Sequence, residues 1–168
     1  MAETGMAKSN IDRRGILGWL GGSAATLALA ACGSPADARA YPVKYSDAEW
    51  RKRLTADQYY ILRKKGTERP GTSPLLGEHR KGTFVCAADG NPLYSSTTKY
   101  DSGTGWPSFW QPLPKAIATS LDFETGAPRT EVHCSRCGGH LGHVFSDGPK
   151  PTGKRYCMNG DALLFKAG

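Results

Sequence analysis

Short runs in which apolar and polar residues alternate fill the second half of the chain, and glycine, proline or asparagine separates most of them. Alternation with a period of two predicts β-strands that bury one face. We therefore expect the chain from Gly82 onward to form an all-β body. Strands are expected at residues 83–86, 93–96, 116–123, 129–133, 143–145, 155–158 and 163–165.

The segment before this body carries helix-start signals instead. The runs Ser-Asp-Ala-Glu at residues 46–49 and Thr-Ala-Asp-Gln at residues 55–58 are both capping boxes, in which the first and fourth residues close the helix start. They predict two short helices, the second ending near Lys65 with Gly66 just beyond its end. The predicted fold class is thus mainly β, with α+β character.

Residues 66–79 join the helices to the strands and are rich in glycine, proline and threonine, so they are expected to form a loop. Glu68 lies near the start of this loop. Two interpretations of it stay open: the carboxylate anchors the loop, or it is simply solvated.

Length and charge narrow the class of protein. A chain of 168 residues, 39% hydrophobic and 22% charged, suits one soluble globular domain. Its net charge of +7 is compatible with nucleic-acid binding. No run of basic residues interleaved with aromatic ones is present, however, so we expect no nucleic-acid partner.

The first 31 residues have the composition of an export signal and are left out of fold reasoning. Arg13 and Arg14 form a twin arginine, and the uncharged stretch 15–31 that follows is only mildly apolar. This pattern predicts a signal peptide of the bacterial Tat pathway, which exports folded proteins.

The signal ends in Leu-Ala-Ala-Cys, which resembles a lipobox with Cys32 as the lipidated residue. A lipoprotein carries several acyl chains, so the protein would stay on a membrane surface in the periplasm. The alternative is cleavage after the Ala-Arg-Ala run at residues 38–40, which would release a soluble periplasmic protein. We expect residues 32–45 to form a flexible tether and residues 46–168 to form the functional domain.

The candidate chemistry is concentrated near the C-terminus. In the strand expected at residues 155–158, Arg155 and Cys157 point to one face, together with Asn159 beyond them. A nearby cation lowers the pKa of a thiol and favours the nucleophilic thiolate. His140 and His143 precede this strand across a turn-rich link. The pattern indicates cysteine-dependent redox or acyl chemistry, although a lone cysteine in a strand also fits a small core residue.

Three motifs carry a family resemblance: YDSGTGWPSFWQP at residues 100–112, CGGHLGHVFSDGP at residues 137–149 and PTGKRYCMNG at residues 151–160. Together they closely resemble the signatures of the peptide-methionine (R)-S-oxide reductase family, over residues 47–165. The resemblance implies a small twisted fold of two antiparallel sheets. It also implies reduction of the R epimer of methionine sulfoxide in oxidised proteins.

The same resemblance implies residue roles. Cys157 would be the nucleophile, converted to a sulfenic acid as methionine is released. The matching polar catalytic positions are His140, His143, Asp147, Arg155 and Asn159. Trp106 and Phe145 match the apolar wall that contacts the substrate methyl group.

Three other cysteines suggest a metal site. Cys134 and Cys137 form a C-x-x-C-G turn, and Cys86 and Asp89 repeat its spacing with a carboxylate in place of the second sulfur. The family resemblance implies a structural zinc held by these four residues, with Asp89 as an unusual ligand. A disulfide among the three cysteines is an open alternative in an oxidising compartment, as is a thioredoxin-like redox role for the C-x-x-C pair.

Recycling of the nucleophile is where the chain departs from the family. Thr104 occupies the position at which many members carry a resolving cysteine. We therefore expect a thioredoxin-like protein to reduce Cys157 from outside, unless one of the three other cysteines resolves it. Alternatives from other classes are a zinc-ribbon binding module, a thiol hydrolase using Cys157 and His143, and a lipoprotein that only assembles with partners.

Overall fold

The computed structural model describes residues 41–168. The sequence predictions of a signal peptide and of lipid on Cys32 concern residues outside this range. None of the helices in the described part has the length and apolar character needed to cross a membrane.

Two helices open the described chain, as the capping boxes predicted. Helix α1 spans Asp47–Arg53 and helix α2 spans Ala56–Lys64, and both capping boxes are formed. The end of α2 differs by one residue from the prediction. Lys65, with φ of 56°, takes the left-handed conformation expected of Gly66. The Lys65 side chain is held by Glu131 at 2.9 Å, and Gly66 lies so close to the Tyr60 ring that a Cβ would clash with it.

The chain is attached to the domain from Tyr41 onward, although residues 41–45 fall within the predicted tether. The Tyr41 ring lies edge-on to His133, with ring centroids 5.8 Å apart. The Val43 amide donates a hydrogen bond to the Arg136 carbonyl at 2.9 Å. These contacts bring the start of the described chain next to the C-x-x-C turn.

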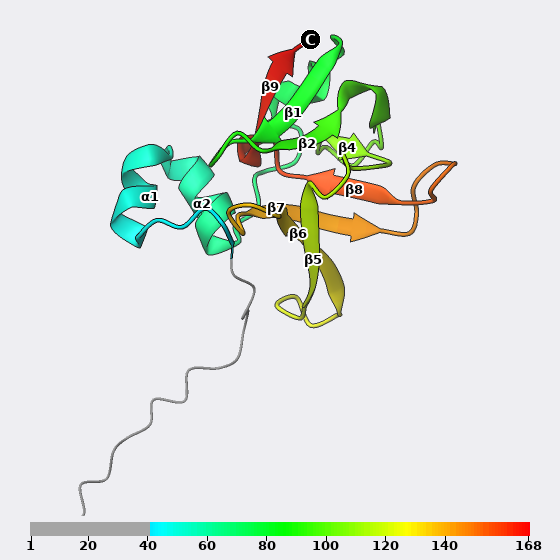
Figure 1. The fold of residues 1–168 in the computed structure, drawn as a ribbon. Coiled ribbons are helices and arrows are strands. Elements are labelled where there is room, and N and C mark those ends of the chain that lie inside the picture. Colours follow the sequence, from blue (N-terminus) through cyan, green and yellow to red (C-terminus); the bar gives the residue numbers. More distant parts are fainter. Residues whose placement is uncertain (1–40) are drawn as a thin grey trace, which may run out of the picture. The chain divides into compact units, whose positions relative to one another are not determined.

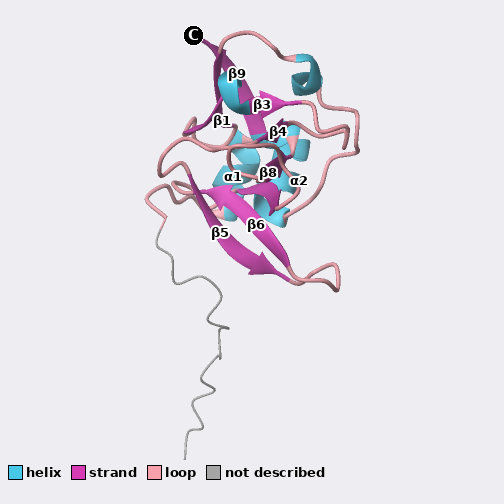
Figure 2. Cartoon of the chain, turned by 90° about the vertical axis from the view of Figure 1, so that its right-hand side faces the viewer, coloured by secondary structure: helices cyan, strands magenta, loops and turns pink. Residues whose placement is uncertain are grey.

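The remaining chain forms two antiparallel sheets (Figures 1 and 2), which confirms the predicted mainly β fold class. A three-stranded sheet has the order β2-β1-β9 and a six-stranded sheet the order β3-β4-β8-β7-β6-β5. The small sheet consists of β1 Gly82–Cys86, β2 Pro92–Ser95 and β9 Leu163–Ala167. The large sheet consists of β3 Lys99–Tyr100, β4 Ser108–Phe109, β5 Ile117–Asp122, β6 Arg129–Cys134, β7 His140–Phe145 and β8 Arg155–Met158.

Strands β3 and β4 were not predicted from the sequence. Each has only two residues, too few to show an alternation, and a proline directly precedes β4. Three short 3-10 helices were also missed: η1 Pro74–Gly77, η2 Ser96–Thr98 and η3 Gly160–Ala162. Strand β4 matters for the site because it pairs with β8, the strand that carries Cys157.

The core lies between the two sheets and under the helices. Tyr94 of the small sheet stacks on Phe109 of the large sheet with ring centroids 4.3 Å apart, and Phe84 meets the same ring edge-on. Ile61 and Leu62 of α2 belong to the same buried cluster. Figure 1 shows the helices beside β7, at the opposite side of the domain from the turn between β7 and β8. The hairpin β5–β6 projects from the sheet in both views.

Glu68 anchors the loop that follows the helices, which decides between its two interpretations. Its carboxylate accepts hydrogen bonds from the backbone amides of Gly160 at 2.6 Å and Asp161 at 3.0 Å. Its own amide donates to the Asn159 side chain at 3.1 Å, and its carbonyl accepts from the Trp106 indole at 3.2 Å. One residue therefore ties three separate segments together at the end of β8.

Candidate active site

The register of the large sheet places Cys157 in a row of polar residues. Cys157 of β8 is paired with Ser108 of β4 on one side and with His143 of β7 on the other. His143 is in turn paired with Glu131 of β6, and Glu131 with Ser120 of β5. Directly paired residues project from the same face of a sheet. The pairing therefore brings residues from five strands to one surface.

A cavity of about 120 Å³ opens on this surface. It contains several residues that the sequence singled out: Cys157, His143, Trp106, Phe145 and Asn159. Thr67, Arg129 and Gly142 complete its lining and were not anticipated. The cavity thus combines a thiol, an imidazole, a guanidinium and two aromatic rings.

The apolar and amide groups of this cavity are fixed by contacts behind them. Trp106 is oriented by its indole hydrogen bond to the Glu68 carbonyl. Asn159 accepts from the Glu68 amide and donates to the Leu141 carbonyl at 3.1 Å, so both ends of its amide are engaged. The cavity wall is therefore preorganised on this side.

Arg155 and Asp147 lie outside the cavity lining. Arg155 makes a two-point ion pair with Asp147, at 3.0 and 2.8 Å, and its guanidinium covers the Phe145 ring at 4.4 Å from the centroid. The Arg155 side chain is largely covered, with 11% of it exposed, whereas that of Asp147 is exposed. Arg155, which lies on the same strand as Cys157, thus supports the Phe145 ring from outside the cavity.

The thiol of Cys157 is not lowered in pKa, contrary to the sequence expectation. Burial raises its pKa above the usual value, while a hydrogen bond with Thr104 and the charge of Arg155 act in the opposite direction. Thr104 Oγ1 lies 3.9 Å from Cys157 Sγ, and Ser102 links Thr104 to Ser108 through hydroxyl contacts of 2.9 and 2.7 Å. The cation has the expected effect, but desolvation outweighs it.

His143 is held by a carboxylate that the sequence did not reveal. Its Nε2 lies 2.6 Å from Asp122 Oδ2, and the same oxygen accepts a hydrogen bond from Arg129 at 2.8 Å. Burial lowers the pKa of His143, and the hydrogen bond to Asp122 opposes that shift. At neutral pH the ring is therefore uncharged, with its proton on the nitrogen that faces Asp122 and Nδ1 left as an acceptor.

His140 lies behind His143, with ring centroids 5.3 Å apart, and does not line the cavity. Its Nδ1 is 2.8 Å from Glu131, whose carboxylate also accepts from Lys65 at 2.9 Å and from Ser120 at 3.2 Å. Burial raises the pKa of Glu131, but the hydrogen bonds and charges of His140 and Lys65 outweigh burial and lower this pKa to about 2. The result is a buried charge network beneath the surface that carries Cys157.

One signal in the sequence points to the residues that the sequence reasoning missed. Along β5, Ser120 and Asp122 face the site, while Leu121 between them and Phe123 just beyond are exposed. An aspartate on the inward side of a strand whose outward side is apolar inverts the usual pattern. Such an inversion marks a buried polar group that needs a partner, here His143 and Arg129.

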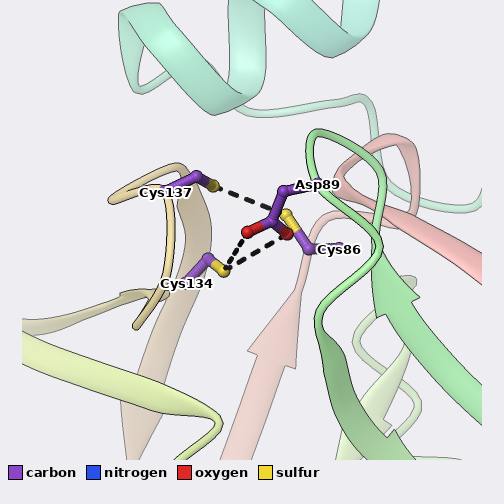
Figure 3. Close-up of side chains that lie close together, drawn as sticks. All are labelled: Cys86, Asp89, Cys134 and Cys137. Carbon is purple, nitrogen blue, oxygen red and sulfur yellow. Dashed lines mark hydrogen bonds between the residues drawn. The ribbon is translucent and has the colours of Figure 1, made fainter. Parts of the chain in front are cut away.

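A second cluster lies at one end of both sheets (Figure 3) and could hold a metal ion. Ligand atoms of Cys86, Asp89, Cys134 and Cys137 all lie within 4.8 Å of one another. Cys86 Sγ is 3.7 Å from Cys137 Sγ, and Cys134 Sγ is 3.7 Å from Asp89 Oδ1. None of the three thiols is in a disulfide in this structure.

The two halves of this cluster have the same backbone geometry. In each turn a glycine amide bonds back to the first cysteine's carbonyl, Gly90 to Cys86 at 2.8 Å and Gly138 to Cys134 at 2.9 Å. Both glycines have positive φ, 70° and 68°, a conformation that side chains disfavour. The two turns therefore have the same shape, as in metal sites built from two C-x-x-C turns, and Asp89 takes the place of a fourth sulfur.

The site thus places the half-buried thiol of Cys157 in a cavity with histidine and aromatic walls, on a small two-sheet β fold. The chain matches the SelR domain over residues 54–167. It is therefore a member of the peptide-methionine (R)-S-oxide reductase family and an oxidoreductase.

Curated relatives named peptide methionine sulfoxide reductase MsrB are similar over most of the chain. The protein from Leptospira interrogans is 55% identical over 127 residues, which cover 75% of this chain and 97% of that protein. The protein from Agrobacterium fabrum is 53% identical over 125 residues, covering 74% and 93%. The protein from Hahella chejuensis is 52% identical over 124 residues, covering 73% and 89%.

The carboxylate of Asp122 is expected to set the protonation of His143. Asp122→Asn removes the charge that raises the His143 pKa and leaves burial and Arg129 to lower it. The His143 pKa should therefore fall further, which an NMR titration of its ring proton can follow. Asp147→Asn, an exposed carboxylate paired with Arg155, serves as the control and should leave the titration unchanged. A His143 pKa that stays constant or rises in Asp122→Asn would contradict this assignment.

Proposed function

We propose that this protein reduces the R epimer of methionine sulfoxide in polypeptides to methionine, with Cys157 as the nucleophile. The observation that carries the proposal is the placement of the Cys157 thiol in a cavity shared with Trp106, Phe145 and His143. An apolar wall suits the substrate methyl group, and polar groups opposite it suit the sulfoxide oxygen. A cavity with these two sides distinguishes the epimers at sulfur, because the methyl and the oxygen exchange places between them.

The chemical step is a two-electron transfer between two sulfur atoms. The sulfur of Cys157 attacks the sulfoxide sulfur, and the oxygen passes to Cys157 as the S–O bond of the substrate breaks. Cysteine is oxidised to the sulfenic acid while the sulfoxide is reduced to the thioether of methionine. The thiol proton ends on the transferred oxygen, so atoms and charge balance without another reactant.

The raised pKa of Cys157 affects how the step begins. A thiol that is protonated in the free protein must lose its proton as it attacks, because the thiolate is the nucleophile. His143 is the neutral base in the cavity, and Asp122 stabilises its protonated form. His143 therefore can take the thiol proton and return it to the sulfoxide oxygen, which is general base followed by general acid catalysis.

The function is tested by separate assays of R and S peptide methionine sulfoxide with dithiothreitol as reductant. We expect turnover of the R epimer alone, and a loss of at least about a thousandfold in Cys157→Ser because the nucleophile is removed. Thr97→Ser, an exposed position in η2, is the control and should keep full activity. Folded, reduced protein that turns over neither epimer, or a Cys157→Ser variant that stays active, would refute the proposal.

We further propose that the cluster of Cys86, Asp89, Cys134 and Cys137 binds a structural zinc ion. Tetrahedral zinc with Zn–S bonds of about 2.3 Å holds its sulfur ligands about 3.8 Å apart, close to the 3.7 Å between Cys86 and Cys137. Hydrogen bonds to Cys134, together with burial, raise the pKa of Cys86 and Cys137. A bare cluster therefore does not hold three thiolates, and a cation supplies the charge that it needs.

Metal binding can be read out without an activity assay. We expect one zinc per chain by elemental analysis, and a thiolate-to-metal absorption band after replacement by cobalt. Cys134→Ser should lose the ion and lower the unfolding temperature, because binding at such a site is coupled to folding. Asp89→Cys should retain the ion and shift the cobalt spectrum toward that of a four-sulfur site. Metal-free wild type after refolding with excess zinc would contradict the assignment.

For recycling, we propose that an external thiol, from a thioredoxin-like protein, reduces the sulfenic acid. The group beside Cys157 is the hydroxyl of Thr104, which cannot form a disulfide. The other described cysteines, Cys86, Cys134 and Cys137, all belong to the proposed zinc site. On this basis no thiol of the described chain is free to resolve Cys157.

Mass spectrometry after a single turnover tests this route. Wild type should carry a dimedone-reactive sulfenic acid on Cys157 and no internal disulfide. Thr104→Cys should instead form a disulfide between Cys157 and the introduced thiol, because the native side chain lies 3.9 Å from the sulfur. Thr104→Ser is the matched control without a thiol. A disulfide from Cys157 to any native cysteine would refute the proposal that an external thiol reduces Cys157.

We propose that these repairs take place on exported proteins, with the enzyme held on a membrane surface. The support is the twin arginine at residues 13 and 14 and the lipobox-like end at Cys32. Loading of zinc before export of the folded chain would protect the cysteines from oxidation. Cell fractionation of Cys32→Ser distinguishes the two routes: release from the membrane fraction supports the lipid anchor, and an unchanged soluble distribution supports cleavage after residue 40.

A further inference from the structure

Arg129 is a residue of the cavity to which neither the sequence motifs nor the family resemblance assigned a role. It begins β6 and is paired in the hairpin with Asp122 of β5. One terminal nitrogen of its guanidinium donates to Asp122 Oδ2 at 2.8 Å. About a third of the side chain is exposed, at the cavity that also contains Cys157.

The guanidinium has hydrogen-bonding capacity that the described chain does not use. It carries five N–H donors in a planar fork, and the bond to Asp122 engages one of them. Its Nε is buried and has no partner among residues 41–168. A buried donor without an acceptor is costly, and about a third of the Arg129 side chain is exposed. The guanidinium can therefore donate further hydrogen bonds to an oxygen from outside the protein.

Charge decides which kind of oxygen fits. Asp122 already compensates the positive charge of Arg129, and the same carboxylate holds His143. An anionic ligand would have to approach this carboxylate as well as the guanidinium. A neutral carbonyl oxygen gains the hydrogen bond without that repulsion.

The size of the cavity also indicates that Arg129 meets the backbone of the substrate. A cavity of about 120 Å³ is of the size that holds one side chain, and it is too small for a peptide. When a methionine sulfoxide side chain enters it, the peptide backbone must stay at the mouth. The partly exposed guanidinium of Arg129 is placed to meet that backbone.

We propose that Arg129 is a specificity-determining residue that binds a backbone carbonyl next to the methionine sulfoxide. It thereby favours peptide-bound over free methionine sulfoxide, an inference that rests on the proposed function. Asp122 has a double role in this arrangement, since it aims both the guanidinium and the imidazole.

The test compares two substrates that share the sulfoxide but differ in the backbone. These are N-acetyl-methionine (R)-sulfoxide methylamide, which has neutral carbonyls, and free methionine (R)-sulfoxide, which has a carboxylate. Arg129→Lys keeps the ion pair with Asp122 but loses the fork, and Arg129→Met loses both. We expect kcat/KM for the blocked substrate to fall about 10- to 100-fold, the range of one charge-assisted hydrogen bond, and that for the free amino acid to fall less than about threefold.

The control is Arg51→Met, which removes an arginine from an exposed pair with Asp47 outside the site and should leave both substrates unaffected. Thermal unfolding of each variant shows whether it folds. If Arg129→Met does not fold, the comparison of the two substrates is made with Arg129→Lys. An equal loss with both substrates, or no loss with either, would overturn the role of Arg129. Wild type inactive toward both substrates would instead overturn the proposed function and this inference with it.

Discussion

The hydrogen-bonded register of β8 between β4 and β7 is the constraint on which the rest of the site depends. It fixes the direction of the Cys157 side chain and puts Ser108 on one side of it and His143 on the other. Because the partners lie on paired strands, their separation is set by the sheet and not by mobile loops. A slip of one residue would turn the thiol into the core and the core residue Met158 outward.

The same sheet also places carboxylates next to the basic groups that surround the half-buried thiol of Cys157. Carboxylates compensate the basic groups of the site: Asp122 of β5 pairs with Arg129 on the adjacent strand β6 and also contacts the neutral His143 on β7, two strands away. Glu131 is compensated in the same way by Lys65 from the end of α2. The cavity is therefore polar without carrying a large net field. This balance explains why the thiol pKa follows burial and not the charge of a single cation.

The sequence predicted the parts of the fold and site that local patterns encode. Both capping boxes specified their helices because the signal lies within four residues, and the longer strands showed their alternation. Strand β4 was missed because two residues cannot display a period, although it flanks Cys157. The pairing of Asp122 with His143 was also missed, since the partners are 21 residues apart and meet only when β5, β6 and β7 assemble.

Residue placement shows a similar limit. The motifs singled out Cys157, His143 and Trp106, and the structure places all three at one cavity. They did not distinguish the lining residues from those behind them, such as His140. That distinction depends on the bulge in the β6–β7 pairing between Val132 and His133, which no local pattern announces.

The hydroxyl groups packed behind Cys157 have a kinetic consequence. Thr104 lies 3.9 Å from the sulfur and is linked through Ser102 to Ser108, and none of the three lines the cavity. The cavity is therefore the opening at which a second molecule would meet the sulfur. On the proposed function, a methionine sulfoxide and a reducing thiol would use this same opening in turn and would not be bound together. Such an enzyme follows ping-pong kinetics, and an excess of either reactant slows it by occupying the form that should receive the other.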